Sequence, residues 1–364
     1  HRQWLTELTD LPTAAGREQR VRAWVDQWVA RREGLRTRTD EHGNLLIGRA
    51  GISGRRPIVF EAHMDHPGFV VASAGEPVIA RFLGGVKDDY FPDATVRFYP
   101  QEGEPVVGRI QEPIDSDDWA KRFAISVDDP EALQTGDIGH FDVGPSRIVD
   151  GRLHAVACDN LASVAAALSA FDVLRRRNAA EGVDVRVFLT RAEEIGFIGS
   201  IGACRSKTLP ANSRVIVLEN SRAYAESPIG GGPIVRVGDA TSTFDPELTW
   251  TLGEVARARA DRDENFQWQR RLMPGGTCEA SAYQAMGYTA ACLCLPLGNY
   301  HNMSDEPGKV AAETIAVDDF HGLVDLLVDA AVALGGSQEA PDFRDRLGRL
   351  FEQRRGELNP ESGG

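Results

Sequence analysis

The sequence has few cysteines, no long apolar run and no excess of positive charge. Its five cysteines are an odd number without any Cys-x-x-Cys pair, which argues against a disulfide framework or a cysteine-rich zinc site. No apolar stretch is long enough to cross a bilayer, and the N-terminus lacks a charged-then-apolar signal pattern. We therefore expect a soluble protein of the reducing cytoplasm that has no membrane partner.

The charge and the glycine pattern exclude two further classes of partner. A formal net charge of −14 argues against nucleic acid as the main ligand, because a phosphate backbone requires excess Lys and Arg. The glycines at 230–232 and 275–276 match neither the lysine-ended phosphate loop nor the dinucleotide fingerprint. We interpret them as tight turns beside a substrate cleft.

The remaining composition is that of a globular protein whose 364 residues suit two domains, or one with an insertion. Strands and helices alternate after residue 154, which predicts an α/β fold with a mixed sheet covered by helices on both faces. We expect helices near 160–177, 246–260, 278–286 and 318–334, and strands near 183–190, 214–219, 266–272 and 289–295. An amphipathic helix over 17–33 carries Trp24 and Trp28, which we interpret as core residues rather than a ligand platform.

Residues 73–150 differ from the rest of the chain. They carry many short β-like runs separated by Gly, Pro and Asp, and almost no helical periodicity, which predicts a small inserted β-barrel-like domain. The main domain then comprises 1–72 and 151–335, followed by a C-terminal tail over 336–364. In that tail we expect a disordered end and one short docking helix, whose apolar residues are Phe343, Leu347, Leu350 and Phe351.

Polar side chains follow the predicted strands where each strand ends. The stretch VDVRVFLTRAEE, residues 183–194, is an apolar strand that leads into two adjacent glutamates. Ligands collect beyond the carboxyl ends of strands in α/β sheets, so these positions form one short set. Its members are His63, Asp65, Asp159, Glu193, Glu194, Glu219 and His301.

Each of these residues alone has an ordinary structural explanation. The glutamate pair is typical of a solvated surface, His63 of a core histidine, and Asp159 of a cap on the helix that begins at Asn160. Together they offer two imidazoles and several carboxylates, which are ligands that zinc accepts. Two histidines and three carboxylates suit a two-metal centre with one shared carboxylate, and leave another carboxylate free as a base.

Six segments in order carry a family resemblance over roughly residues 4–334. They are EAHMDHPGFVV, LHAVACDNLASVAAAL, FLTRAEEIGFIGSIGA, GGPIVRVGD, PGGTCEASAYQAMG and LGNYHNMSDEP. The sequence resembles the glutamyl aminopeptidase type of tetrahedral aminopeptidases, which are co-catalytic di-zinc exopeptidases. The resemblance implies a catalytic main domain with an inserted β-domain, and a homo-oligomer that ranges from dimer to hollow dodecamer.

The resemblance also implies a ligand set for two divalent metal ions, most plausibly Zn²⁺, with Co²⁺ or Mn²⁺ as alternatives. Asp159 would bridge both ions. His63 and Glu219 would complete one site, and Glu194 and His301 the other. The metals would polarise the scissile carbonyl and lower the pKa of the bound water.

Two further residues take catalytic roles by the same resemblance. Glu193 would be the general base that activates the water, and Asp65 would orient His63 through the other ring nitrogen. The implied activity is removal of N-terminal residues from short peptides. A carboxypeptidase or an N-acyl amino acid deacylase on the same scaffold is the main alternative, and a catalytically silent assembly or peptide-binding protein is a third.

The chain departs from the family pattern at several positions. His66 stands where the family has an acidic residue, Glu219 where it has aspartate, and Cys278 with Glu279 where it has Asp-Ala. The order Tyr300, His301, Asn302, Met303 also differs from the usual Met-His. These departures leave the side-chain preference open. We interpret Cys278 and Cys158 as small core residues, with thiolate ligation as the alternative.

Overall fold

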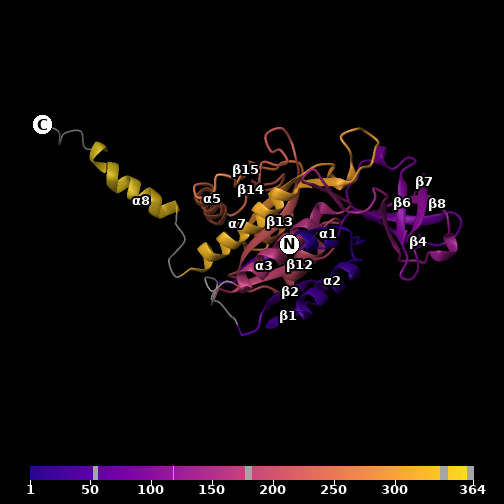
Figure 1. The fold of residues 1–364 in the computed structure, drawn as a ribbon, viewed down its shortest axis with the longest axis horizontal. Coiled ribbons are helices and arrows are strands. Elements are labelled where there is room, and N and C mark those ends of the chain that lie inside the picture. Colours follow the sequence, from indigo (N-terminus) through magenta and orange to yellow (C-terminus); the bar gives the residue numbers. More distant parts are fainter. Residues whose placement is uncertain (52–55, 118, 177–182, 337–342, 359–364) are drawn as a thin grey trace.

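A computed structural model describes residues 1–364 except 52–55, 118, 177–182, 337–342 and 359–364. Figure 1 shows a central sheet surrounded by helices, a barrel at one end and helix α8 extending beyond the other end. The predicted α/β class, with a mixed sheet and an inserted β-barrel, is confirmed. None of the helices within the described ranges is both long and apolar enough to cross a membrane.

The central sheet contains eight strands. Their order is β1 (Leu35–Thr39), β2 (Leu45–Arg49), β12 (Val185–Thr190), β3 (Ile58–His63), β13 (Arg214–Arg222), β16 (Thr289–Leu297), β14 (Ile234–Gly238) and β15 (Gln269–Leu272). The four neighbours β12, β3, β13 and β16 run parallel. Strands buried on both faces need nearly continuous apolar runs, which these four have. Their carboxyl ends therefore meet at one edge of the sheet.

Helices cover both faces of this sheet. One face packs against α1 (Arg2–Thr9), α2 (Gln19–Ala30), α3 (Cys158–Arg176), α5 (Pro246–Ala260) and α7 (Val317–Gly335). The other face packs against α4 (Ile198–Arg205) and α6 (Glu279–Ala285). Helix α3 is buried along nearly its whole length and contacts β3, β12 and β13. It therefore holds its first residues beside the carboxyl ends of those strands.

The inserted barrel is closed and antiparallel. Its strands are β4 (Gly68–Ser73), β5 (Val78–Leu83), β8 (Lys121–Val127), β7 (Val106–Ile114), β6 (Thr95–Tyr99) and β9 (Ile138–Phe141), in that spatial order. Phenylalanine rings fill its interior, with Phe69 against Phe82 at 4.9 Å and against Phe141 at 5.5 Å. The chain leaves β3 for the barrel and returns to α3 through β10 (Arg147–Val149) and β11 (Arg152–Ala155). These two strands form a small sheet with β17 (Glu313–Ala316).

The expected helix in the C-terminal tail is α8 (Phe343–Arg354). Its four apolar side chains are 40 to 54% exposed, so this face is not docked on the rest of the chain. Contacts at its first turn join the Phe343 ring to Trp250 at 5.7 Å and Arg346 to Glu254 at 3.9 Å. The disorder expected at the chain end concerns 359–364, which lie outside the described residues.

Candidate metal centre

The seven residues singled out from the sequence come together at the carboxyl edge of the sheet. His63 ends β3, the glutamate pair follows β12, Glu219 lies in β13, Asp159 lies in the first turn of α3, and His301 follows β16. Their side chains are almost entirely withdrawn from solvent. The backbone is strained there, because Ala192 has φ +54° and His301 has φ +55°.

The carboxylate of Asp159 lies between the two imidazoles. Its Oδ1 is 3.4 Å from Nε2 of His63, and its Oδ2 is 3.7 Å from Nε2 of His301. On the outer sides, Glu219 Oε2 lies 3.9 Å from Nε2 of His63, and Glu194 Oε1 lies 3.3 Å from Nε2 of His301. One carboxylate thus faces two half-sites, each with one histidine and one further glutamate.

Hydrogen bonds at the other ring nitrogens orient both imidazoles. Nδ1 of His63 lies 3.2 Å from the carbonyl oxygen of Asp65 and 3.5 Å from its Oδ1. Nδ1 of His301 lies 2.7 Å from the carbonyl oxygen of Gly85, in the loop after β5 of the barrel. Because carbonyl oxygens only accept, each Nδ1 carries a proton, so Nε2 is the nitrogen that each neutral ring would offer to a metal ion.

Asp65 also holds the turn that carries the glutamate pair. Its Oδ1 accepts the backbone N–H of Glu193 at 3.0 Å, and its Oδ2 accepts that of Glu194 at 3.1 Å. Burial alone would raise the pKa of Asp65, but the hydrogen bonds from His63 and from these amides lower it below its ordinary value. Asp65 therefore remains a carboxylate and ties β3 to the turn after β12.

The cluster fits divalent cations. Two sets, His63 with Glu193 and Glu219, and His63 with Asp159 and Glu194, each place their ligand atoms within 4.8 Å of one another. Asp159 Oδ1 and Glu194 Oε1 are buried and accept no hydrogen bond. Buried carboxylate oxygens without donors cost free energy, and metal ions would satisfy them. Glu193 belongs to one of these sets, so its assignment as a base is a proposal.

The pKa values of the carboxylates express the same need for cations. Burial, together with the charges of Glu194 and Glu219, raises the pKa of Glu193 well above its ordinary value. Burial and Asp159 raise the pKa of Glu219 in the same way. Without a metal ion, several like charges share one water-poor site, which favours their protonated forms. Two divalent ions would remove that penalty.

Glu313, at the start of β17, is a residue that the sequence pattern did not single out. It is fully buried, and its two oxygens accept the backbone N–H groups of Asp159 and His301, each at 2.8 Å. Glu313 therefore fixes the distance between two candidate ligands, one at the start of α3 and the other in the segment after β16. An acidic residue within the apolar stretch VAAETIAV was the signal that could have found it.

The departures from the family pattern lie close to this centre. Nδ1 of His66 contacts the carbonyl oxygen of Asp159, and its Nε2 lies 3.2 Å from Oδ1 of Asn302. Burial, with a smaller effect of His301, lowers the pKa of His66 to about 4, so the ring is neutral at pH 7. Cys278 and Cys158 are buried and belong to no candidate metal group among the described residues, which favours their interpretation as core residues.

A cavity of about 730 Å³ opens beside the cluster. Its other walls come from the end of β13 and the loop after it, from β14, from the loop after β15, from the segment after β16 and from the inserted domain. They include Lys87, Arg222, Arg236 and Tyr300. The guanidinium of Arg236 is buried and donates to Ser221 Oγ at 3.2 Å and to the carbonyl oxygen of Gly276 at 3.1 Å. The volume is within the range of small-ligand sites.

The metal-free protein is expected to lose stability as pH rises above 6.5. The pKa values of Glu193 and Glu219 are raised in the folded chain. Above pH 4.5, the folded chain therefore keeps protons that the unfolded chain has lost. Facing carboxylates raise the pKa of His63 and His301. The resulting stabilisation is complete below pH 6.5 and is lost as the pH rises above that value. The lowered pKa of His66 makes stability increase with pH, but only below pH 6.5.

Urea unfolding of the chelated protein at several pH values measures this dependence, and the zinc-loaded protein serves as the control. We expect the free energy of unfolding to change less with pH when zinc is bound, because the ions compensate the charges of the same carboxylates. A free energy of unfolding that increases from pH 7 to pH 9 in the metal-free protein would contradict the expectation.

Comparison with known proteins places this chain in a family. The family model for M42 glutamyl aminopeptidases matches residues 43–306, which is more than half of the chain. Among curated proteins, none matches the sequence. Solved structures also share the fold, and three of them follow. For each, the first coverage is the share of this chain that is aligned, and the second is the share of the other chain.

The TET aminopeptidase of the archaeon Thaumarchaeota SCGC AB-539-E09 is 17% identical, with coverages of 92% and 96% and a TM-score of 0.74. The TET1 peptidase of Pyrococcus horikoshii is 19% identical, with 93% and 99% covered and a TM-score of 0.72. An aminopeptidase of Desulfurococcus kamchatkensis is 20% identical, with 93% and 98% covered and a TM-score of 0.71. These likenesses confirm the fold, and the match to the family model shows that the chain is a peptidase that belongs to the M42 glutamyl aminopeptidase family.

Proposed function

We propose that this protein is a metal-dependent aminopeptidase that hydrolyses the N-terminal peptide bond of short peptides. The observation that carries the proposal is the carboxylate of Asp159 between two oriented imidazoles, beside an open cavity. His63, Asp159 and Glu219 would hold one divalent ion, and Asp159, Glu194 and His301 the other. Imidazole and carboxylate ligands favour Zn²⁺, with Co²⁺ or Mn²⁺ as alternatives.

Bound metal ions would supply Lewis-acid polarisation of the scissile carbonyl. Glu193 would take a proton from the attacking water and later give it to the amine nitrogen as the C–N bond breaks. Its backbone is held by Asp65, and its Oε2 lies 3.9 Å from Nε2 of His63. Burial raises the pKa of this carboxyl group well above its ordinary value, which favours its taking up the proton in the first step.

Arg236 favours a second candidate function. A carboxypeptidase or an N-acyl amino acid deacylase needs a cation that holds the free carboxylate of its substrate. The buried guanidinium of Arg236 lines the same cavity as Glu219 and, within the described part of the chain, forms no ion pair at 4.0 Å or less. The same group would equally hold an acidic side chain of an aminopeptidase substrate.

A substrate panel separates these activities. Aminoacyl amides and short peptides, with free and with acetylated N-termini, are incubated with the metal-free protein after addition of Zn²⁺, Co²⁺ or Mn²⁺. We expect release of the free N-terminal amino acid from unblocked substrates only. Preferential cleavage of the acetylated substrates would replace the aminopeptidase by a deacylase, and release of C-terminal residues would indicate a carboxypeptidase.

We also propose that the chain forms a homo-oligomer in the cytoplasm. The TET1 peptidase of Pyrococcus horikoshii assembles into a tetrahedron or a large octahedral shell, which supports the first part. All five cysteines are free, which is typical of a reducing compartment. Sedimentation velocity tests the assembly, where a monomer would contradict it, and fractionation of the producing cells tests the location.

A further inference from the structure

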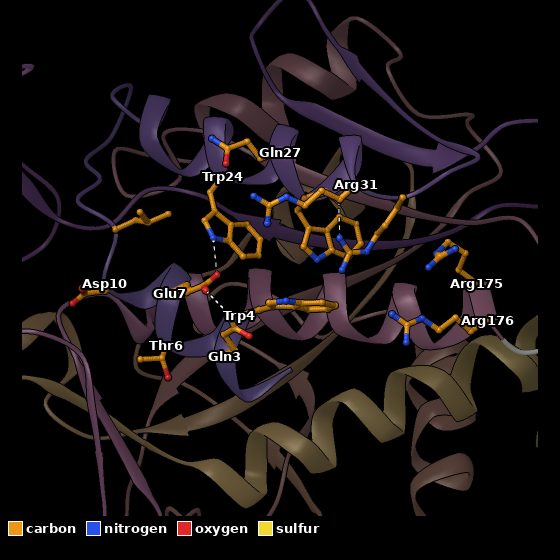
Figure 2. Close-up of a pocket in the computed structure, with 13 residues that line it drawn as sticks. Gln3, Trp4, Thr6, Glu7, Asp10, Trp24, Gln27, Arg31, Arg175 and Arg176 are labelled. Carbon is orange, nitrogen blue, oxygen red and sulfur yellow. Dashed lines mark hydrogen bonds between the residues drawn. The ribbon is translucent and has the colours of Figure 1, made fainter.

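A second cavity, of about 800 Å³, lies between α1, α2 and the C-terminal end of α3 (Figure 2). Asp159 lies at the start of α3 and Arg176 at its end, and a helix of 19 residues separates its ends by about 28 Å. The basic end of this groove is therefore remote from the metal centre. Trp28 is buried as the sequence predicted, but Trp24 is only half-buried and lines the groove.

The middle of the groove is aromatic and ordered. The rings of Trp4 and Trp28 meet edge to face at 5.5 Å, and the guanidinium of Arg32 lies 3.7 Å from the ring of Trp28 and 4.7 Å from that of Trp4. Nε1 of Trp24 donates to Glu7 Oε2 at 3.0 Å. These contacts hold three indoles in place around one cavity. Trp28 is buried, so the half-buried Trp4 and Trp24 are the rings that offer apolar surface to a ligand.

One end of the groove is strongly basic. Arg32, Arg175 and Arg176 share the buried carboxylate of Asp172, at 3.0, 3.1 and 2.6 Å. Arg31 also lines the groove, where Figure 2 shows its side chain pointing toward Trp24, and the described residues include no ion-pair partner for it. Three guanidinium groups thus share a single carboxylate at the basic end, in a chain whose net charge is −14. This end has unused capacity for an anion.

The opposite end is acidic. Glu7 accepts hydrogen bonds from Gln3 and Trp24, and Asp10 accepts the backbone N–H of Ser146. Neither carboxylate has a cationic partner among the residues that the structure describes. Figure 2 shows Asp10 and Glu7 on one side of the tryptophans and the side chains of Arg175 and Arg176 on the other. The groove is therefore acidic, then aromatic, then basic along its length.

We propose that this groove binds a short peptide with both termini free. The α-ammonium group would lie at Glu7 and Asp10, the α-carboxylate at Arg175 and Arg176, and apolar side chains against the indoles. Guanidinium groups bind carboxylates through paired, charge-assisted hydrogen bonds, and a volume of about 800 Å³ accommodates a di- or tripeptide. This site would be separate from the metal centre and does not depend on the proposed catalytic function.

Calorimetry with trileucine tests the proposal on the full chain. The Glu193→Gln variant is used so that the peptide stays intact, which chromatography of the mixture verifies. We expect a groove site whose affinity falls about tenfold or more when Arg175→Gln and Arg176→Gln are combined, since each substitution removes a charge at the basic end. Arg32 still holds Asp172 in this variant, and an unchanged melting temperature verifies that the fold persists.

Three controls identify the contacts. Glu7→Gln keeps an oxygen for Trp24 but removes the charge, so it should weaken binding of trileucine more than binding of its N-acetyl analogue. The C-terminal amide should be insensitive to the arginine substitutions. Arg349→Ala, on the exposed surface of α8, should change nothing.

The expected result is peptide binding that needs both free termini and the groove charges and that survives Asp159→Ala. Binding that is unaffected by the groove variants and is lost in Asp159→Ala would place the peptide at the metal centre only and overturn the proposal. Equal affinity for free and blocked peptides would also overturn it. The result of the substrate panel does not depend on binding in the groove, so either proposal can be wrong while the other holds.

Discussion

Replacing Glu193 with glutamine is expected to lower kcat by about a thousandfold while the protein keeps its metal ions, since positioned acid–base groups contribute about that much. Glutamine has nearly the same shape and can still occupy the turn that Asp65 holds through the backbone amides. It cannot take a proton from water at neutral pH. Steady-state hydrolysis of an aminoacyl amide, with elemental analysis of the same preparation, measures both quantities.

The metal analysis is essential because Glu193 also lies within ligand distance of His63 and Glu219. If the glutamine variant binds one equivalent of zinc fewer than the unmodified protein, Glu193 is a ligand and the base must be sought elsewhere. Normal turnover with full metal content would exclude both roles. Glu226→Gln is the matched control, because that carboxylate is exposed, lies in the loop after β13, and should leave activity unchanged.

Asp159→Ala is expected to remove both metal ions and all measurable turnover. Each half-site would retain one imidazole and one glutamate, and neither would have the shared carboxylate that faces both histidines. Without binding, zinc would no longer stabilise the fold, an effect that reaches about 2.7 kcal/mol at a hundredfold excess of metal over Kd. Elemental analysis and thermal unfolding with and without zinc measure these losses.

Asp159→Asn provides a graded comparison. Its amide oxygen can still face one imidazole, but the shared negative charge is gone, so we expect at most one ion to be retained. Asp305→Ala removes an exposed carboxylate near the cavity and serves as the control for general loss of acidity. Two tightly bound equivalents of zinc in Asp159→Ala would refute the bridging role.

The positions of most site residues were predictable from local sequence. His63, Glu193 and Glu219 lie in or directly after apolar strands, and parallel strands bring their carboxyl ends to one edge whatever the details of packing. The same logic predicted the barrel, because residues 73–150 lack helical periodicity. His301 and Asp159 needed more than periodicity, and the family resemblance supplied their pairing.

Contacts between distant segments were not predictable in this way. Glu313 accepts amides of Asp159 and His301, and Gly85 of the barrel accepts Nδ1 of His301. Such hydrogen bonds involve backbone groups that every residue has, so residue type does not reveal which amide or carbonyl group is the partner. Trp24 was likewise assigned to the core, since its helical spacing does not reveal whether a neighbouring helix covers the ring.

The sequence by itself determined which strands are buried, which imidazoles and carboxylates follow them, and which family the ordered motifs resemble. Only the tertiary structure decided where these groups lie relative to one another. It set Asp159 between His63 and His301, and it left a groove between α1, α2 and α3 with opposite charges at its ends. The physical reason is that residue types set what a group can bind, whereas distances between groups far apart in the chain are set by packing.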